Sequence, residues 1–204
     1  ITGGLGYIGT ELCKIYSGYS WNDNITVIDN RFISERVNQL RHWNINFVHA
    51  DILNKEVISK YCKNADIIHH LAGVTDVPRV KSESNLEHDE KIKKVAQEGT
   101  QNILDVMSDD CKIILPSTHV VYEGIEKVKN NIFEDEPVKP KLSYATSKAI
   151  NEKQLKNSGK NFIILRLGSV YGYSTDTARI DIMPNLFSKI ASQNGTLKLF
   201  AGGR

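Results

Sequence analysis

Short apolar runs alternate along the chain with segments whose apolar residues recur at the three- to four-residue spacing of a helix. The runs are rich in Ile, Val and Leu and lack alternating polar positions, which is typical of strands buried on both faces of a sheet. Six runs predict strands: Ile25–Asp29, Ile45–His49, Asp66–Leu71, Lys112–Pro116, Phe162–Leu167 and Leu197–Phe200. The segments around them predict helices at about Gly6–Ser17, Ser34–Trp43, Lys55–Cys62, Asp89–Met107, Ser143–Asn157 and Asp181–Gln193. This repetition predicts an α/β fold with a doubly wound parallel sheet.

One long segment follows neither pattern. Residues Glu123–Lys141 are mostly polar and include Pro137 and Pro140. We therefore expect a surface loop there, and long loops inside compact domains are often functional.

The composition excludes several classes of protein. Of the 204 residues, 26 are Lys or Arg and 24 are Asp or Glu, which gives a net charge of +2. This balance argues against a protein that holds nucleic acid by bulk charge. No apolar stretch approaches the ~18 residues that a membrane span needs, and no secretory signal is visible. We therefore expect neither nucleic acid nor a membrane as a partner.

The cysteines and histidines do not predict a disulfide framework or a metal site. Cys13, Cys62 and Cys111 are odd in number and widely spaced. Such thiols are typical of a reducing compartment, so we expect a cytoplasmic protein. His69 and His70 are neighbours on a predicted strand, where adjacent side chains point to opposite faces. They cannot easily bind one ion together, and we predict no metal.

Both ends of the sequence lie very close to predicted elements. Ile1 and Thr2 leave little room for the strand that should precede a glycine-rich turn, and Arg204 follows closely after a strand-like run. We therefore expect the sequence to be part of a longer protein.

A glycine-rich segment at Thr2–Gly9 (TGGLGYIG) places glycines at positions 3, 6 and 9. Such glycines allow a tight turn and let a phosphate approach the N–H groups at a helix N-terminus. A glycine-rich turn without a ligand is the alternative, but Asp29 ends the next strand, where an acid can accept hydrogen bonds from ribose hydroxyls. Its carboxylate disfavours the 2′-phosphate of NADP and favours NAD, while Arg31 keeps NADP open.

A second group of residues predicts proton transfer. Tyr144 and Lys148 are four positions apart in a predicted helix and so lie one turn apart on one face. A nearby Lys⁺ stabilises a phenolate and lowers the pKa of Tyr, as a general base requires. Ser117 and Thr118 follow a predicted strand at its carboxyl end, where a hydroxyl could hold a substrate oxygen. The alternatives are a solvated surface Tyr–Lys pair and a helix-capping Ser/Thr.

Several further segments complete an ordered series of motifs. After TGGLGYIG and Asp29 come Asp51-Ile52, HLAG at 70–73, PSTHVVYEG at 116–124, YATSK at 144–148 and LRLGSVYG at 165–172. The series resembles the extended short-chain dehydrogenase/reductase superfamily, and more narrowly its NAD-dependent nucleotide-sugar epimerases and dehydratases. The resemblance covers nearly the whole chain. It implies a Rossmann-like fold, NAD as cofactor and a nucleotide-sugar substrate.

The resemblance also implies roles for matching residues. Thr118 matches the Ser/Thr that holds the substrate oxygen, Tyr144 the catalytic base, and Lys148 the residue that tunes this base and binds the nicotinamide ribose. The implied cofactor-binding set, besides Tyr144 and Lys148, is Gly3, Gly6, Tyr7, Ile8, Gly9, Asp29, Asn30, Asp51, Ile52, Leu71, Ala72 and Gly73.

Four positions depart from the family pattern. The nucleotide-sugar 4,6-dehydratases carry Asp-Glu directly after the catalytic Thr, where this chain has His119 and Val120. Val120 cannot act as an acid or base, which disfavours loss of water. His119 is either a second proton donor or a packed or solvent-facing side chain. Ser169 and Ala96 stand where Asn is usual, so the departures affect the substrate side of the site and leave the cofactor side intact.

These observations predict a nucleotide-sugar epimerase, similar to the UDP-glucose 4-epimerases, that transfers a hydride transiently to NAD. We expect residues 1–171 to form the Rossmann-like domain and residues 172–204 to begin a smaller, largely missing C-terminal substrate domain. The alternatives are an NAD(P)-dependent reductase, dehydrogenase or dehydratase of a sugar nucleotide or other carbonyl compound, and a non-catalytic dinucleotide-binding regulatory protein. The resemblance also implies a homodimer through helices 89–107 and 143–157, although the sequence shows no apolar seam.

Overall fold

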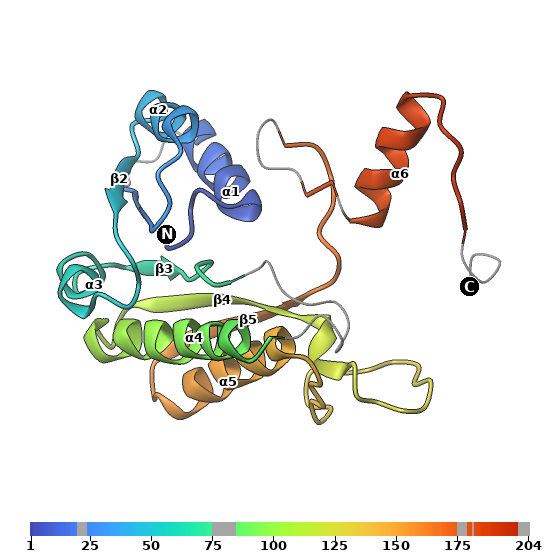
Figure 1. Ribbon diagram of the computed structural model, residues 1–204. Helices are drawn as coiled ribbons and strands as arrows, with labels where there is room; N and C mark the ends of the chain where they lie inside the picture. The colour runs from blue at the N-terminus through green and yellow to red at the C-terminus, as the bar shows by residue number, and fades with distance from the viewer. Residues whose placement is uncertain (20–23, 75–84, 175–178, 181, 200–204) are drawn as a thin grey trace. The chain divides into compact units, whose positions relative to one another are not determined.

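The computed structural model describes residues 1–19, 24–74, 85–174, 179–180 and 182–199. The chain divides into two compact units, residues 1–167 and residues 168–204. The first unit contains β1–β5 and α1–α5, and the second contains α6 (Met183–Ser192), as Figure 1 shows by label. The functional division into a cofactor domain and a substrate domain stays a prediction.

The first unit is built on parallel strands. They are β1 (Thr26–Asp29), β2 (Asn46–His49), β3 (Ile67–His69), β4 (Lys112–Thr118) and β5 (Asn161–Leu167). β1 pairs with β2, and β4 pairs with both β3 and β5. Thr2 joins the two groups through parallel bridges to Ile28 of β1 and to His70 just after β3. The resulting order, β2–β1–Thr2–β3–β4–β5, confirms the predicted doubly wound parallel sheet.

Helices cover both faces of β1. The helices of the first unit are α1 (Tyr7–Gly18), α2 (Ser34–His42), α3 (Lys55–Cys62), α4 (Leu86–Val106), α5 (Ser143–Asn157) and the short 3-10 helix η2 (His119–Tyr122). Ile28 belongs to a core cluster that includes residues of α3, α4 and α5, whereas Val27 belongs to a cluster with residues of α1 and α2. Because neighbouring strand residues point to opposite faces, the two clusters lie on the two sides of the sheet. Figure 1 shows α4 and α5 side by side along β4.

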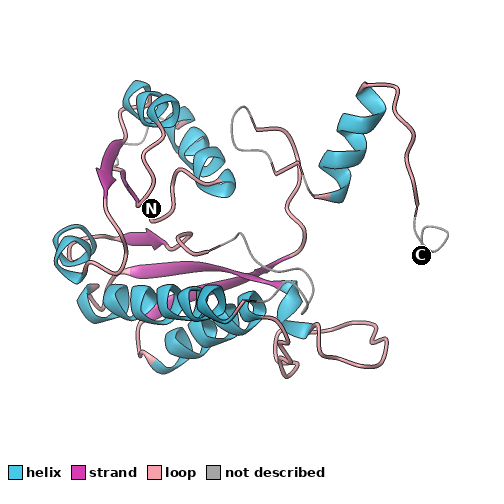
Figure 2. Cartoon of the chain, in the orientation of Figure 1, coloured by secondary structure: helices cyan, strands magenta, loops and turns pink. Residues whose placement is uncertain are grey.

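The segment predicted to be a loop contains neither helix nor strand, as Figure 2 shows between η2 and α5. Its base is closed by backbone hydrogen bonds, from Lys139 to the Val121 carbonyl and from Gly124 to the Lys139 carbonyl, both at 2.8 Å. The Glu123 carboxylate also accepts a hydrogen bond of 2.6 Å from the backbone N–H of Leu142, the residue before α5. The start of α5 is therefore fixed to the end of η2.

Two strand predictions differ from the structure. β4 extends to Thr118 because residues 116–118 keep pairing with β5, so Thr118 lies inside the strand end and not after it. Residues 197–199 form no strand, and Phe200 lies outside the described residues. Leu197 and Leu199 are exposed, and the described part of the second unit offers them no strand to pair with. The prediction of a strand there was wrong for residues 197–199.

The cysteines and helices of the described residues carry two further findings. Cys13, Cys62 and Cys111 are free and buried, and burial raises the pKa of the Cys13 and Cys62 thiols to about 11. Such thiols stay protonated and unreactive near neutral pH.

None of the helices within the described ranges has the length and apolar character needed to span a membrane.

Candidate active site

The glycine-rich turn connects Thr2 to α1 in very little space. Gly3 has a φ of 71°, and a Cβ there would lie 2.6 Å from the backbone nitrogen of Ala72. A Cβ on Gly9 would lie 2.5 Å from the Gly3 carbonyl oxygen. Side chains at either position would push the turn away from the strand ends. The sequence motif therefore has a steric cause in the protein itself.

The N-terminus of α1 is open to an anion. Gly6 is its N-cap residue and provides no side-chain cap, and the first turn, which includes Tyr7 and Ile8, contains no acidic residue. A Cβ on Gly6 would have only two neighbours within 4 Å, the Gly3 carbonyl oxygen at 3.2 Å and the Arg31 guanidinium at 3.8 Å. The partial positive charge of a helix N-terminus favours a phosphate at such a position.

Asp29 ends β1 beside this turn. Its Oδ2 accepts a hydrogen bond of 3.0 Å from the backbone N–H of Leu5, and its Oδ1 accepts one of 3.0 Å from the backbone N–H of Arg31. The Nε of Arg31 lies 3.4 Å from the same Oδ1. The carboxylate is almost fully buried, while the Arg31 side chain is exposed. Through its hydrogen bond to Leu5, Asp29 holds the glycine-rich turn in place.

The next two predicted cofactor residues are brought together. Asn30 donates a hydrogen bond of 3.0 Å to the carboxylate of Asp51, whose other oxygen accepts one of 2.9 Å from the backbone N–H of Leu53. Ile52 is buried in the core, where a Cβ on Gly99 would come within 2.3 Å of it. Asn30 and Asp51 therefore present polar groups at the ends of β1 and β2, while the Ile52 side chain packs inward.

The segment after β3 follows the start of the chain. The backbone N–H of Leu71 donates to the Thr2 carbonyl at 3.0 Å, and that of Ala72 to the Thr2 hydroxyl at 3.3 Å. Gly73 is exposed, with open space around its Cβ position. Leu71, Ala72 and Gly73 thus lie beside the glycine-rich turn, at the same edge of the sheet.

The three predicted catalytic residues lie at the carboxyl end of β4 and the beginning of α5. Thr118 is the last residue of β4 and is buried, and its hydroxyl accepts a hydrogen bond of 3.3 Å from the backbone N–H of Val120. Tyr144 is in the first turn of α5, with the Lys148 ammonium 6.0 Å from the centre of its ring. Lys148 donates a hydrogen bond of 2.9 Å to the Pro116 carbonyl, two residues before Thr118.

Lys148 is buried, and burial disfavours its charged form. Burial lowers the pKa of the Lys148 ammonium to about 8. A lysine with this pKa is still charged at neutral pH, and its positive charge acts strongly on a nearby phenol in a buried environment. The site can therefore stabilise Tyr144 as a phenolate, which is the chemistry of a general base.

His119 and Val120 follow Thr118 in η2. The Nδ1 of His119 lies 3.1 Å from the Leu167 carbonyl. A carbonyl only accepts, so Nδ1 carries the proton and the exposed ring keeps Nε2 as an acceptor when neutral. Val120 offers no group that could transfer a proton. The structure thus presents one titratable side chain where the dehydratase pattern has two acids.

The sequence did not predict a network of buried hydrogen bonds between polar side chains near the site. His70 contacts the hydroxyls of Thr2 at 2.8 Å and of Thr100 at 2.9 Å, and Thr100 accepts a hydrogen bond of 2.8 Å from Asn151 of α5. His69 instead contacts the Tyr16 hydroxyl at 2.8 Å. This network of hydrogen bonds connects Thr2, at the start of the sheet, to α5, the helix that carries Tyr144. The signal in the sequence was weak, because the partners of His70 are 68 and 30 residues away.

The burial of His70 predicts an acid-sensitive fold. Burial, followed by the nearby Lys148 charge, lowers the pKa of His70 from 6.5 to about 3. Between these values the unfolded chain binds a proton that the folded protein does not. The free energy of unfolding should fall with a slope of about 1.4 kcal/mol per pH unit as the pH drops through this window.

Urea unfolding of the protein and of His70→Gln at several pH values measures this slope. The variant is expected to lose it. His42→Gln is the matched control, because His42 is exposed on α2. Parallel pH profiles for the protein and His70→Gln would contradict the prediction.

Comparisons with known proteins agree with this geometry. A model of the NAD dependent epimerase/dehydratase family matches residues 1–204. The chain is 32% identical over 143 residues to a CDP-paratose 2-epimerase of Salmonella typhi, covering 64% of this chain and 39% of that protein. It is 29% identical over 184 residues to a putative UDP-glucose 4-epimerase of Methanocaldococcus jannaschii, covering 86% of this chain and 57% of that protein. The chain thus spans about half the length of the curated relatives it matches.

A solved structure supports the fold as well. The UDP-glucuronic acid 4-epimerase of Bacillus cereus, solved in complex with NAD, superposes with a TM-score of 0.76 at 25% identity. The match covers 99% of this chain and 65% of that one. The Rossmann-like fold expected from the sequence motifs is confirmed.

Proposed function

Because the chain belongs to the NAD-dependent epimerase/dehydratase family, we propose that it is a nucleotide-sugar epimerase that acts most simply at C4 of the sugar. One observation carries the proposal: α5 presents Tyr144 and Lys148 together, and Lys148 is bonded to β4 two residues before Thr118. This arrangement on two adjoining elements supports Tyr144 as the base, Lys148 as the cation that tunes it and Thr118 as the hydroxyl that faces the substrate.

The described residues fit NAD. The N-terminus of α1, which has no side-chain cap, and the absence of a side chain at Gly6 suit the pyrophosphate. Asp29 suits the ribose hydroxyls of the adenosine, and Asn30 with Asp51 suits the adenine side. Held by these residues, NAD would supply a reversible hydride acceptor for the sugar carbon and would not be consumed over a full cycle.

The residues of the chain then manage one proton and one developing charge. The Tyr144 hydroxyl oxygen, as phenolate, takes the proton of the substrate hydroxyl and later returns it. The Lys148 ammonium, 6.0 Å from the centre of the Tyr144 ring, stabilises this phenolate by its positive charge. The Thr118 hydroxyl orients the substrate oxygen and stabilises its partial negative charge.

The alternative functions, a dehydratase, a net reductase and a non-catalytic regulatory protein, differ in what they require of the site. A dehydratase of the Asp-Glu type would need an acid or base at Val120, which has neither. A net reductase would need stoichiometric NAD(P)H, and Arg31 beside Asp29 is the residue that keeps NADP open as its cofactor. A regulatory protein without catalysis would bind NAD but convert no substrate.

The lowered pKa of Lys148 predicts an alkaline limb in the rate. Lys148 loses its proton above about pH 8, and the Tyr144 phenolate then loses its stabilising charge. We expect kcat/KM to fall by up to tenfold per pH unit above about pH 8. A profile from about pH 6 to about pH 10 checks this. Lys148→Arg, whose guanidinium keeps its charge, should move the limb upward. A flat alkaline profile in the unaltered protein would contradict the prediction.

A panel of UDP-, dTDP-, GDP- and CDP-sugars with trace NAD tests the function. Products are separated by chromatography and weighed by mass spectrometry, and full-length protein is used. A new peak of unchanged mass establishes an epimerase and identifies its substrate. Loss of water would point to the dehydratase, consumption of NAD(P)H to the reductase, and NAD binding without any product to the regulatory protein.

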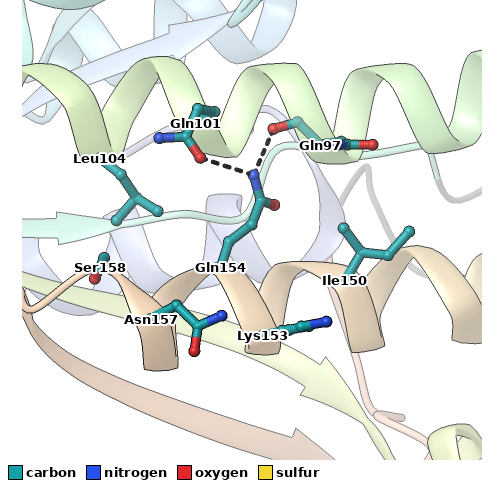
Figure 3. Close-up of a pocket in the computed structure, with 8 residues that line it drawn as sticks. All are labelled: Gln97, Gln101, Leu104, Ile150, Lys153, Gln154, Asn157 and Ser158. Atoms are coloured by element: carbon teal, nitrogen blue, oxygen red, sulfur yellow. Dashed lines mark hydrogen bonds between the residues drawn. The ribbon is translucent and has the colours of Figure 1, made fainter.

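The homodimer and the location belong to the same proposal. A pocket of about 450 Å³ lies between α4 and α5 and contains none of the predicted site residues. Figure 3 shows Gln154 of α5 donating to the backbone carbonyl of Gln97 and the side chain of Gln101 on α4, at 2.8 Å and 3.2 Å. We propose that a second copy covers these helices, which light scattering would test. The buried free thiols support a cytoplasmic location, to be checked by cell fractionation.

A further inference from the structure

A buried ion pair extends the α5 face that carries Tyr144 and Lys148. Glu152 follows Lys148 by four residues, as Lys148 follows Tyr144, so the three share one face of the helix. Arg166 of β5 donates to both carboxylate oxygens of Glu152, from Nε at 2.9 Å and from Nη2 at 2.6 Å. The Glu152 side chain is only 3% exposed and the Arg166 side chain 13% exposed. The pair therefore fixes how α5 lies against β5.

The same helix face is bonded to β4. The Ser117 hydroxyl donates to Glu152 Oε1 at 2.6 Å, and Lys148 Nζ donates to the Pro116 carbonyl at 2.9 Å. These two strand residues directly precede Thr118. Glu152 and Lys148 thus set the register between α5 and the strand end that carries the substrate-facing hydroxyl.

The other side of Arg166 holds the long loop. Its Nη1 donates to the Tyr122 hydroxyl and, at 2.9 Å, to the Glu134 carbonyl. The Tyr122 hydroxyl in turn donates to the Phe133 carbonyl at 3.1 Å. One guanidinium therefore connects β5 with α5, with η2 and with the loop that leads into α5.

The chemistry of the Glu152–Arg166 pair favours a role in positioning α5 over a role in stabilising the fold. Burial opposes the charge of Glu152, but hydrogen bonds from Arg166 and Ser117 outweigh it, so the pKa of Glu152 lies below its ordinary value. Apolar side chains of similar volume are often as stabilising as a buried ion pair. A planar guanidinium, in contrast, binds a carboxylate in a fixed bidentate arrangement. Such a contact restricts sliding and rotation of the helix.

We propose that Glu152 and Arg166 are positioning residues that hold Tyr144 and Lys148 at the end of β4. The proposal rests on the proposed function, because it takes Tyr144 as the base. Without the pair, α5 moves against β4 and Lys148 leaves the Pro116 carbonyl. Lys148 then stabilises the Tyr144 phenolate less, and Tyr144 keeps its proton to higher pH.

Two conservative substitutions test this. Arg166→Lys keeps the charge but loses the bidentate fork, and Glu152→Gln keeps the shape but loses the charge. We expect each to lower kcat by about 10- to 100-fold with KM changed less than about twofold, since a small displacement of a catalytic group has effects of this size. The ultraviolet absorbance of tyrosinate is titrated in each protein and in its Tyr144→Phe version. The difference reports Tyr144 alone, and its midpoint should rise in both variants.

Lys156→Gln is the matched control. The Lys156 ammonium lies 3.8 Å from the same Glu152 carboxylate but its side chain is 53% exposed, so its loss should change neither kcat nor the titration. Unchanged kcat and titration in Arg166→Lys and Glu152→Gln, with only a lower unfolding temperature, would overturn the proposal. If Glu152→Gln does not fold, Arg166→Lys and Tyr122→Phe decide by the same readouts. The titration needs no substrate, so the positioning role is tested even if no sugar nucleotide is converted and the proposed function fails.

Discussion

Tyr144→Phe is expected to lower kcat by about 10²- to 10⁴-fold while NAD stays bound, because it removes the proposed general acid–base group and keeps the aromatic ring. The ring remains on the first turn of α5, and Lys148 keeps its hydrogen bond to the Pro116 carbonyl. The glycine-rich turn and Asp29, which are expected to hold the cofactor, belong to other elements. Rates come from product chromatography, and bound NAD is released and quantified.

Tyr61→Phe is the control for this substitution. Tyr61 also lies beside a lysine, with the Lys60 ammonium 5.9 Å from its ring centre, but it sits on α3 and not at the end of β4. Its replacement should leave kcat unchanged. Full activity in Tyr144→Phe would refute the assigned base, and loss of NAD from that variant would show that the substitution had damaged more than the proton transfer.

Two glycines of one motif are expected to respond differently to the same added methyl group. Gly9→Ala should lower the free energy of unfolding by about 3 kcal/mol, because its Cβ would meet backbone atoms that cannot yield easily. Those atoms are the Gly3 carbonyl oxygen at 2.5 Å and the Gly4 Cα at 2.6 Å. Gly6→Ala should lower stability much less, since its Cβ would meet only the Gly3 carbonyl oxygen at 3.2 Å and the flexible Arg31 guanidinium at 3.8 Å, but it narrows the approach of the pyrophosphate.

Urea unfolding and NAD titration separate the two effects. Gly6→Ala should weaken NAD binding at least tenfold, or by about 1.4 kcal/mol. Gly9→Ala should show a lower unfolding midpoint even without NAD. Equal stability in the two variants would mean that the turn relaxes around Gly9. Undiminished NAD affinity in Gly6→Ala would mean that the pyrophosphate binds elsewhere.

Much of the fold was predictable because its determinants are local. The apolar runs predicted the strands β1–β5, and the spacing of apolar residues predicted α1–α5 to within a few residues. The expected burial on both faces was met best in β1 and β4, whereas β2, β3 and β5 have exposed residues. The run at Leu197–Leu199 has a similar composition but forms no strand. A strand exists only when its backbone groups pair with a neighbour, and composition alone cannot show whether a neighbour is present.

The same distinction between local and long-range contacts applies to the candidate site. Tyr144 and Lys148 are four residues apart on one helix, so their proximity could be predicted from spacing. The contact of Lys148 with Pro116, and of Glu152 with Arg166, joins different elements and depends on how α5 lies on the sheet. In the sequence, His70 was considered as the first residue of the HLAG motif and as a metal ligand, a role that was not predicted. Its partners Thr2 and Thr100 are contributed by distant segments, and only the assembled fold brings them together.

The bridging position of Thr2 has a consequence for how the chain folds. Its neighbours in the sheet are Ile28 and His70, and four backbone hydrogen bonds join the segment Ile1–Gly3 to β1 and to residues 69–71. The β1–β2 pair and the β3–β4–β5 group can each form from shorter-range contacts. Joining them requires the closure of the large loop between residues 2 and 70, and such long-range contacts slow folding. The first residues of the chain are therefore expected to be ordered late, and with them the glycine-rich turn and the site that NAD occupies.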